Sequence, residues 1–288
     1  MPPAMTVAAS ADLTQLLVLL ASMAAAGAFA GFIAGLLGVG GGIVVVPAVF
    51  EALRILEMAP DHRMHVAVGT SLATIIATAT RSARAHHLRG AVDANLLWSW
   101  GPAIFVGVAL GSALSGIASG HVLTAIFGVV ALIVAAYMSI FGNRSHIAQA
   151  LPGQPFTSVL GVIVGLISSM MGIGGGTLSV PILSLCNYPI RYAVGTASAI
   201  GLLIAIPGAF GFVVAGWNAP DLPPFSIGFV NPLAFAAIAP TTILVAPLGA
   251  RVAHALPHRV LRLLFAAFLC LTGSRMLAQT FGLSLFGG

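Results

Sequence analysis

Long apolar runs alternate with short polar stretches along the chain. An α-helix of about 20 apolar residues spans the hydrocarbon core of a bilayer, and most of the runs approach or exceed that length. The pattern therefore predicts an all-α polytopic membrane protein. Its apolar segments are 16–49, 66–83, 96–118, 122–141, 156–185, 192–215, 233–252 and 260–278.

Two of these segments are interrupted by glycine-rich breaks of the same form. The breaks are Gly38-Val39-Gly40-Gly41-Gly42 and Gly172-Ile173-Gly174-Gly175-Gly176, and each is followed by a proline, Pro47 or Pro181. Backbone hydrogen bonds are not lost cheaply in lipid, so an unwound run at membrane depth must be buried in protein or line a polar cavity. The breaks are therefore the predicted substrate site.

Glycine permits positive φ and close backbone approach, so each break is expected to turn amide N–H groups into a cavity. Because proline suits the first helical turn, the short half-helices are predicted to restart near Val46 and Val180. Their positive dipole ends would then face one another and bind an anion without a fixed positive charge. The alternative, that the glycines serve only close helix packing, stays open.

The two halves of the chain align with each other. Residues 38–49 match 172–183, with the glycines, one valine and the proline identical, and the Val-Gly-Thr of 68–70 recurs at 194–196. Transporters are often built from such repeats. The alignment predicts one membrane domain made of two repeats, 1–150 and 151–288.

Arginine placement predicts that these repeats are inverted. The loop from Arg81 to Arg89 is the most basic in the chain, whereas its counterpart at 217–228 contains Asp221 and no arginine. Since basic loops stay cytoplasmic, the two loops are expected on opposite sides, with both termini outside. Inversion requires an odd number of crossings, so each repeat is expected to hold three transmembrane helices and one re-entrant, glycine-broken helical hairpin. An arrangement of eight full spans stays open.

Composition agrees with a membrane protein: 59% of residues are hydrophobic and 6% are charged. The eleven basic residues, all arginine, oppose six acidic residues and form no long cluster of the kind that binds nucleic acid. The histidines at 62, 65, 86 and 87 lack supporting cysteine or carboxylate clusters. No nucleic acid, metal or other cofactor is therefore expected.

The paired Gly-x-Gly-Gly-Gly-x4-Pro elements, each followed by Val-Gly-Thr, resemble the TauE/SafE family of sulfite exporters, also called the toluene sulfonate uptake permease family. The resemblance covers nearly the whole chain. It implies a multi-pass secondary transporter of the bacterial inner membrane, with small organosulfur or related anions such as sulfite, sulfoacetate or other sulfonates as substrates. Export is the expected direction, and an uptake permease for another small anion is the alternative. Proton coupling stays open, because no obvious mid-span acid would carry it.

An intramembrane enzyme is the less favoured alternative. Such an enzyme needs an ionisable or nucleophilic constellation inside the spans, and no HExxH, paired aspartates or Ser-His pairing lies there. The glycine runs are not nucleotide loops, because a P-loop ends in Gly-Lys-Ser or Gly-Lys-Thr and the chain contains no lysine.

The predicted binding residues are the break glycines together with hydroxyl residues beside them or on the helix that follows. Hydroxyls can donate to sulfonate oxygens, although each can instead bond to a carbonyl of its own helix. Ser168, Ser169 and Ser179 also flank the second break, so the second repeat is expected to supply more donors. The predicted set is Gly38, Gly40, Gly41, Gly42, Thr70, Ser71, Gly172, Gly174, Gly175, Gly176, Thr177, Thr196 and Ser198.

Overall fold

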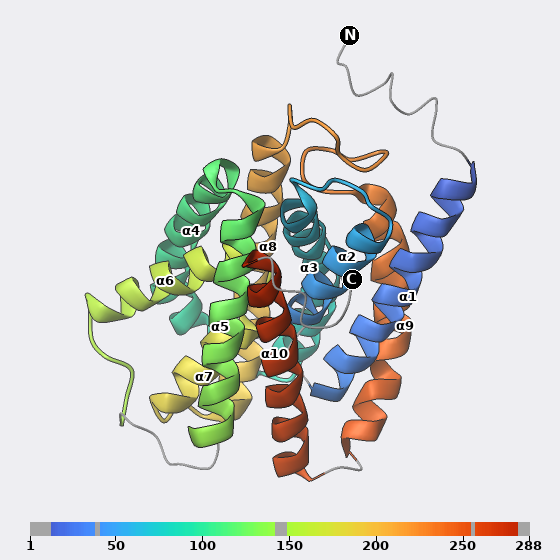
Figure 1. The fold of residues 1–288 in the computed structure, drawn as a ribbon. Helices are drawn as coiled ribbons and strands as arrows, with labels where there is room; N and C mark the ends of the chain where they lie inside the picture. The colour runs from blue at the N-terminus through green and yellow to red at the C-terminus, as the bar shows by residue number, and fades with distance from the viewer. Residues whose placement is uncertain (1–12, 38–40, 142–148, 255–256, 282–288) are drawn as a thin grey trace.

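The computed structural model describes residues 13–37, 41–141, 149–254 and 257–281, and helices make up almost all of them (Figure 1). Each predicted apolar segment is helical, and each glycine-broken segment comprises two helices. The helices are α1 (Leu13–Leu37), α2 (Gly42–Ile55), α3 (Arg63–Leu88), α4 (Ala94–Ile117), α5 (Gly120–Phe141), α6 (Phe156–Met171), α7 (Gly176–Leu185), α8 (Ile190–Ala215), α9 (Pro232–His254) and α10 (His258–Thr280).

Five of the described helices, α4, α5, α8, α9 and α10, are long and apolar enough to cross a membrane. The helix α3 has a comparable length of 26 residues but a more polar sequence. Its residues 64–72 are all buried by neighbouring helices. A helix enclosed by protein presents less surface to lipid and so tolerates more hydroxyl and glycine residues.

The helices α1 and α2 form a hairpin around the first break, as α6 and α7 do around the second. In Figure 1, α1 descends from the end marked N, and α2 returns towards that end, where the loop 216–231 also lies. The second hairpin opens towards the opposite end of the bundle, where α3 ends. There, Tyr188 after α7 donates a hydrogen bond to Asp93 in the loop between α3 and α4. The two hairpins therefore open towards opposite ends of the bundle.

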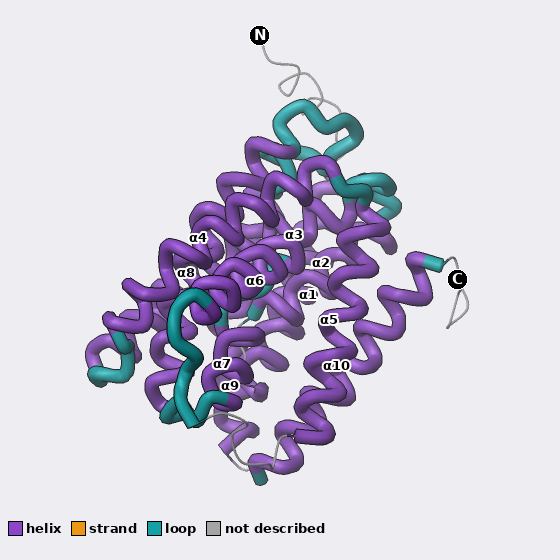
Figure 2. Tube along the Cα trace, turned by 90° about the vertical axis from the view of Figure 1, so that its left-hand side faces the viewer, coloured by secondary structure: helices purple, strands orange, loops and turns teal. Residues whose placement is uncertain are grey.

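Helices of the two halves pack in matching ways. The helix α1 packs along α9 and α6 packs along α4, while α3 contacts α8. When the halves are aligned, α1 corresponds to α6 and α9 to α4, so the first two contacts are equivalent. The helices α5 and α10, equivalent in the same alignment, form a pair along one side of the bundle (Figure 2).

Candidate functional site

The two glycine breaks meet in the interior of the bundle. A Cβ atom placed on Gly42 would lie 2.6 Å from the carbonyl oxygen of Gly172 and 2.9 Å from the Cα of Ile173. Real Cβ atoms essentially never approach other heavy atoms within 3.0 Å. Only glycine therefore fits where the first break touches the second. The predicted residues Gly38 and Gly40 lie outside the described residues.

The backbone of the second break turns at Gly172, which ends α6 with φ +66°. This is the left-handed conformation that glycine adopts at helix ends. The expectation of positive φ is wrong at Gly41 and Gly175, which have φ −65° and −55°. Gly175 is required for space instead, because a Cβ there would lie 2.6 Å from Cγ2 of Ile200.

The short half-helices begin about one turn earlier than expected. They start at Gly42 and Gly176 rather than near Val46 and Val180, and Pro47 and Pro181 lie inside them. The preference of proline for the first turn is overridden here by the break geometry. Since proline has no N–H, the carbonyl groups four residues earlier in each helix lose their usual donor.

The starts of the two short helices carry amide groups that no side chain caps. Neither Gly41 nor Gly175, the N-cap residues of α2 and α7, provides a side-chain hydrogen bond. The amide N–H groups of Gly174, Gly175 and Gly176 find no backbone acceptor in the described part of the chain. Unsatisfied amides at a helix start, where the helix dipole is positive, form a favourable environment for an anion.

Two buried hydroxyl groups flank the second break, one helical turn on either side of it. Ser168 and Ser179 are each 0% exposed, and neither Oγ atom has a hydrogen-bond partner among the described residues. A buried polar group without a partner costs about 1–3 kcal/mol, so such groups call for a ligand or a bound water. Neither serine belongs to the predicted binding set. The sequence signal that indicates them is their position one helical turn from the break.

Predicted residues on the second break lie close to these hydroxyls in the sequence. Thr177, in the first turn of α7, is 2% exposed. Gly174 has room beside it, since a Cβ there would lie 3.5 Å from Cγ2 of Ile75. The side chain of Ile75 also approaches Gly42, so this residue of α3 packs against both breaks.

The hydroxyl group of Ser71 touches the second break directly. Its Oγ donates to the carbonyl oxygen of Gly172 at 2.7 Å, and the residue is buried. This bond satisfies a carbonyl at the helix end that would otherwise lack a donor. Ser71 therefore holds the turn of the break in place from the neighbouring helix α3.

The remaining predicted hydroxyls make hydrogen bonds away from the breaks. The Oγ1 of Thr70 accepts the backbone N–H of Asn231 at 3.1 Å, and that of Thr196 accepts the N–H of Asp93 at 2.9 Å. The Oγ of Ser198 donates to a carbonyl of its own helix at 3.0 Å. The structure thus brings Gly42, Gly172 and Ser71 together and buries Thr177 in the first turn after the second break. It places Thr70, Thr196 and Ser198 in other contacts.

A comparison with known protein families shows which family the chain belongs to. The model of the family described as sulfite exporter TauE/SafE matches residues 23–276, which include both breaks and both Val-Gly-Thr elements. The chain belongs to the TauE/SafE family. It is accordingly a multi-pass membrane transporter.

Relatives of this TauE/SafE chain carry the same kind of description. It is 34% identical over 256 residues to a "probable membrane transporter protein" of Haemophilus influenzae, covering 87% of this chain and 95% of that one. It is 28% identical over 277 residues to a protein of the same description from Methanocaldococcus jannaschii, covering 91% and 97%. No solved structure matches the chain.

The histidines of this family member at the start of α3 make structural contacts. The Nε2 atom of His65 lies 3.1 Å from the carbonyl oxygens of Ser115 and Ala118, which ties α3 to the end of α4. In the part of the chain that the structure describes, no three His, Cys, Asp or Glu side chains are grouped to hold a metal ion.

Proposed function

We propose that the protein exports small organosulfur or related anions, such as sulfite, sulfoacetate or other sulfonates, and binds them at the paired breaks. The observation that carries this proposal is the pair of fully buried hydroxyls of Ser168 and Ser179, which have no partner among the described residues and lie beside the uncapped start of α7. Anion oxygens would accept hydrogen bonds from both hydroxyls and from the amides of the break. Charge-assisted hydrogen bonds of this kind are strong in a site that excludes water.

The proposed setting is the bacterial inner membrane, with two inverted repeats at 1–150 and 151–288 and both termini outside. The opposite openings of the two hairpins and the matching helix contacts support inversion. The arginine-rich end of α3 supports a cytoplasmic position for the loop 89–93.

Binding at the breaks requires a movement. Gly42 contacts Gly172 in this conformation, and Ile75 packs against both breaks. A shift of one hairpin relative to the other would separate the breaks and open them to one side of the membrane at a time. An anion leaving the cell moves down the membrane potential, so export needs no acidic proton relay.

The test is anion binding to purified protein, measured as thermal stabilisation by sulfite, sulfate, thiosulfate, sulfoacetate and lactate. Ser179→Ala and Ser168→Ala should each weaken binding of the best anion by about 1.5–3 kcal/mol, the worth of a hydrogen bond to a charged group. Ser115→Ala is the matched control, because Ser115 is equally buried but its Oγ donates to Gly111 of its own helix at 2.8 Å. Efflux from proteoliposomes then gives the direction.

Two results would count against this function. One is the absence of stabilisation by any of the anions. The other is normal anion binding in Ser168→Ala and Ser179→Ala together with a higher melting temperature, which would mark the hydroxyls as unsatisfied groups without a ligand.

A further inference from the structure

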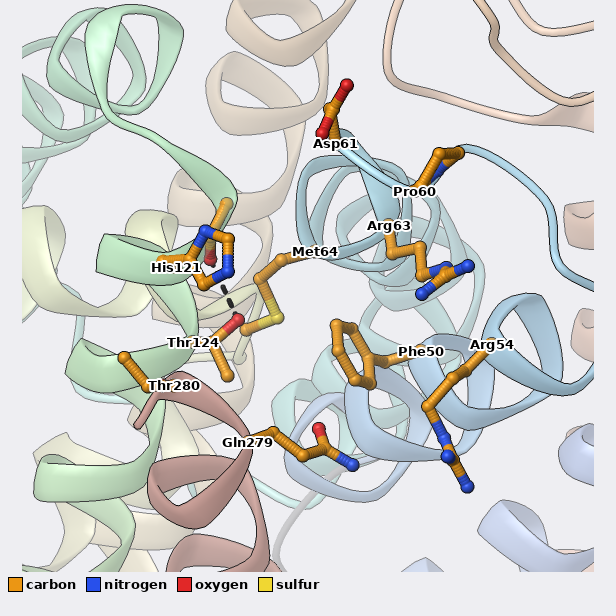
Figure 3. Close-up of a pocket in the computed structure, with 11 residues that line it drawn as sticks. Phe50, Arg54, Pro60, Asp61, Arg63, Met64, His121, Thr124, Gln279 and Thr280 are labelled. Carbon is orange, nitrogen blue, oxygen red and sulfur yellow. Dashed lines mark hydrogen bonds between the residues drawn. The ribbon is translucent and has the colours of Figure 1, made fainter. Parts of the chain in front are cut away.

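A pocket of about 170 Å³ lies at the end of the bundle that holds the loop 216–231, apart from the glycine breaks (Figure 3). The ends of α2 and α10, the starts of α3 and α5, and the loop between α2 and α3 line it. A water molecule occupies roughly 30 Å³ in the liquid. The pocket therefore has room for a molecule of several non-hydrogen atoms.

The lining combines an apolar centre with polar groups on two sides. Phe50 and Met64 lie between His121 and Thr124 on one side and Arg63 on the other (Figure 3). Both central side chains are largely buried, at 9% and 1% exposure. Small-molecule sites typically pair apolar walls with a few polar groups that fix orientation. This lining suits an acidic group joined to a short apolar body better than a bare inorganic ion.

Two arginines of the pocket are held in place by their Nε atoms. The Nε of Arg54 donates to Glu51 at 2.8 Å, and that of Arg63 donates to the carbonyl oxygen of Met58 at 3.0 Å. Their terminal Nη atoms make no hydrogen bond within the described ranges of the chain. An anchored guanidinium with free Nη atoms is preorganised for the oxygens of a sulfonate or carboxylate.

The charges around the pocket favour an anion. The charged groups that line it are Arg54 and Arg63 against Asp61, a net charge of +1. Glu51, which accepts a hydrogen bond from Arg54, is also paired with Arg275. Asp61 is exposed at the rim, where water and salt screen its charge.

The pocket also lies at a seam between two parts of the bundle. The helices α5 and α10 pack mainly on each other and touch the remaining helices less extensively. Glu51 of α2 bridges the seam, because its carboxylate accepts hydrogen bonds from Arg275 and Gln279 of α10, each at 3.0 Å. A ligand in the pocket would contact both sides of this seam.

We propose that this pocket is a second anion site, at the outer end of the transporter, for a small organic anion with an oxyanion group beside a short apolar body. The oxyanion binds the Nη atoms of Arg63 and Arg54, and the apolar body lies on Phe50 and Met64. That this anion is also the exported substrate rests on the proposed function. The residues of the pocket are separate from those of the breaks.

The test is protection of a cysteine placed in the pocket. Thr280→Cys, in a background carrying Cys186→Ser and Cys270→Ser, is labelled with a membrane-impermeant methanethiosulfonate in phosphatidylcholine nanodiscs. The probe 1-propanesulfonate should slow this labelling several-fold, and sulfate at equal ionic strength should slow it less. Arg63→Gln should raise the probe concentration needed for protection roughly tenfold or more, because a charge-assisted hydrogen bond is lost. Arg63→Lys should retain part of the protection.

Ser119→Cys is the control, because Ser119 is exposed at the same end of the bundle but does not line the pocket. Where Arg63→Gln fails to fold, Arg54→Gln, at a side chain that is 40% exposed, replaces it and should also weaken protection. Equal slowing at Ser119→Cys, or protection that survives Arg63→Gln or its replacement, overturns the proposal. Protection by phosphatidylglycerol in place of propanesulfonate also overturns it and assigns the pocket to a lipid headgroup. Ser179→Ala should leave protection of Thr280→Cys unchanged, so failure at the pocket and failure at the breaks are separate results.

Discussion

The side-chain oxygen of Thr196 accepts a hydrogen bond from the backbone N–H of Asp93 at 2.9 Å. In the other half of the chain, Thr70 accepts one from the N–H of Asn231 at 3.1 Å. Asp93 and Asn231 stand immediately before α4 and α9, and each side chain accepts a hydrogen bond from an amide of the helix that follows. Each threonine of the repeated Val-Gly-Thr therefore anchors the start of a helix that belongs to the opposite half.

The glycine before each threonine makes that contact possible. A Cβ on Gly195 would lie 2.1 Å from the carbonyl oxygen of Ala91, and one on Gly69 would lie 2.4 Å from that of Phe229. The Gly-Thr pair thus brings a loop close and then accepts its N–H, at two equivalent places. This packing role is sufficient to explain why the element recurs.

Replacing Thr196 by valine should lower the melting temperature. The buried methyl remains, but the N–H of Asp93 loses its acceptor, which costs about 1–3 kcal/mol. Thr196→Ser keeps the hydroxyl and should be closer to the unmodified protein. Thr80→Val is the control, since Thr80 is exposed and its hydroxyl bonds to its own helix at 2.6 Å. Thermal unfolding of detergent-solubilised protein measures the difference, and equal losses for the valine and serine variants would contradict this account.

Neighbouring glycines of the first break should respond differently to alanine. Gly42→Ala places a methyl 2.6 Å from the carbonyl oxygen of Gly172 and should lower the folded yield and melting temperature. Gly41→Ala meets only ordinary contacts, 3.7 Å from Val45 and 3.9 Å from Thr242, and should fold like the unmodified protein. Size-exclusion profiles and thermal unfolding distinguish the two. Equal tolerance of both changes would mean that the breaks do not touch.

The helices and the position of the breaks could be predicted because both depend on local sequence. Apolar length in lipid and runs of glycine are strong signals that tertiary packing seldom overrides. The restart of α2 at Gly42 rather than near Val46 could not be predicted, because the position of a proline within a helix is only a preference. The need for glycine at 175 comes from Ile200 of another helix and not from φ.

The candidate site could be predicted only in part for the same reason. The sequence places Ser168 and Ser179 beside the second break, but only the packed structure shows that both are buried and that their hydroxyls have no partner in the described part of the chain. The partner of Thr70 is likewise a residue of the distant loop before α9, and no local pattern indicates it. Predictions from sequence therefore located the breaks and named Ser168 and Ser179 as flanking donors, but they did not indicate which flanking hydroxyls lack a partner among the described residues.

Membrane sidedness should follow the arginines. Arg84→Cys and Arg259→Cys should react with an impermeant thiol reagent only from the cytoplasmic side, and Ser119→Cys and Asp221→Cys only from outside. The physical basis of this prediction is that the two loops lie at opposite ends of α8. The loop 89–93 contacts Gly195 near the start of that helix, whereas Asp221 follows its end. Labelling of Arg84→Cys and Asp221→Cys from the same side would refute the inverted arrangement.

The loops that contain Asp93 and Tyr188 should make stability depend on pH in acid. The Tyr188 hydroxyl donates to the Asp93 carboxylate, and this bond, aided by the amides of Leu96 and Asn95, lowers the pKa of Asp93 below its ordinary value of 3.8. Burial, and then the hydrogen bond to Asp93, raises the pKa of Tyr188.

A carboxyl group whose pKa is lower in the folded protein stabilises it above the unfolded pKa, and that contribution disappears as the pH falls through the folded pKa. The protein should therefore melt at a higher temperature than Tyr188→Phe at about pH 6, and the gap should narrow below about pH 4 as Asp93 is protonated. Asp93→Asn, in which no carboxyl titrates, should show little of this pH dependence while losing stability at neutral pH. The measurement is the melting temperature of all three proteins across this pH range. A constant difference in melting temperature between the unmodified protein and Tyr188→Phe down to about pH 3 would show that the contribution of the hydrogen bond does not depend on the charge of Asp93.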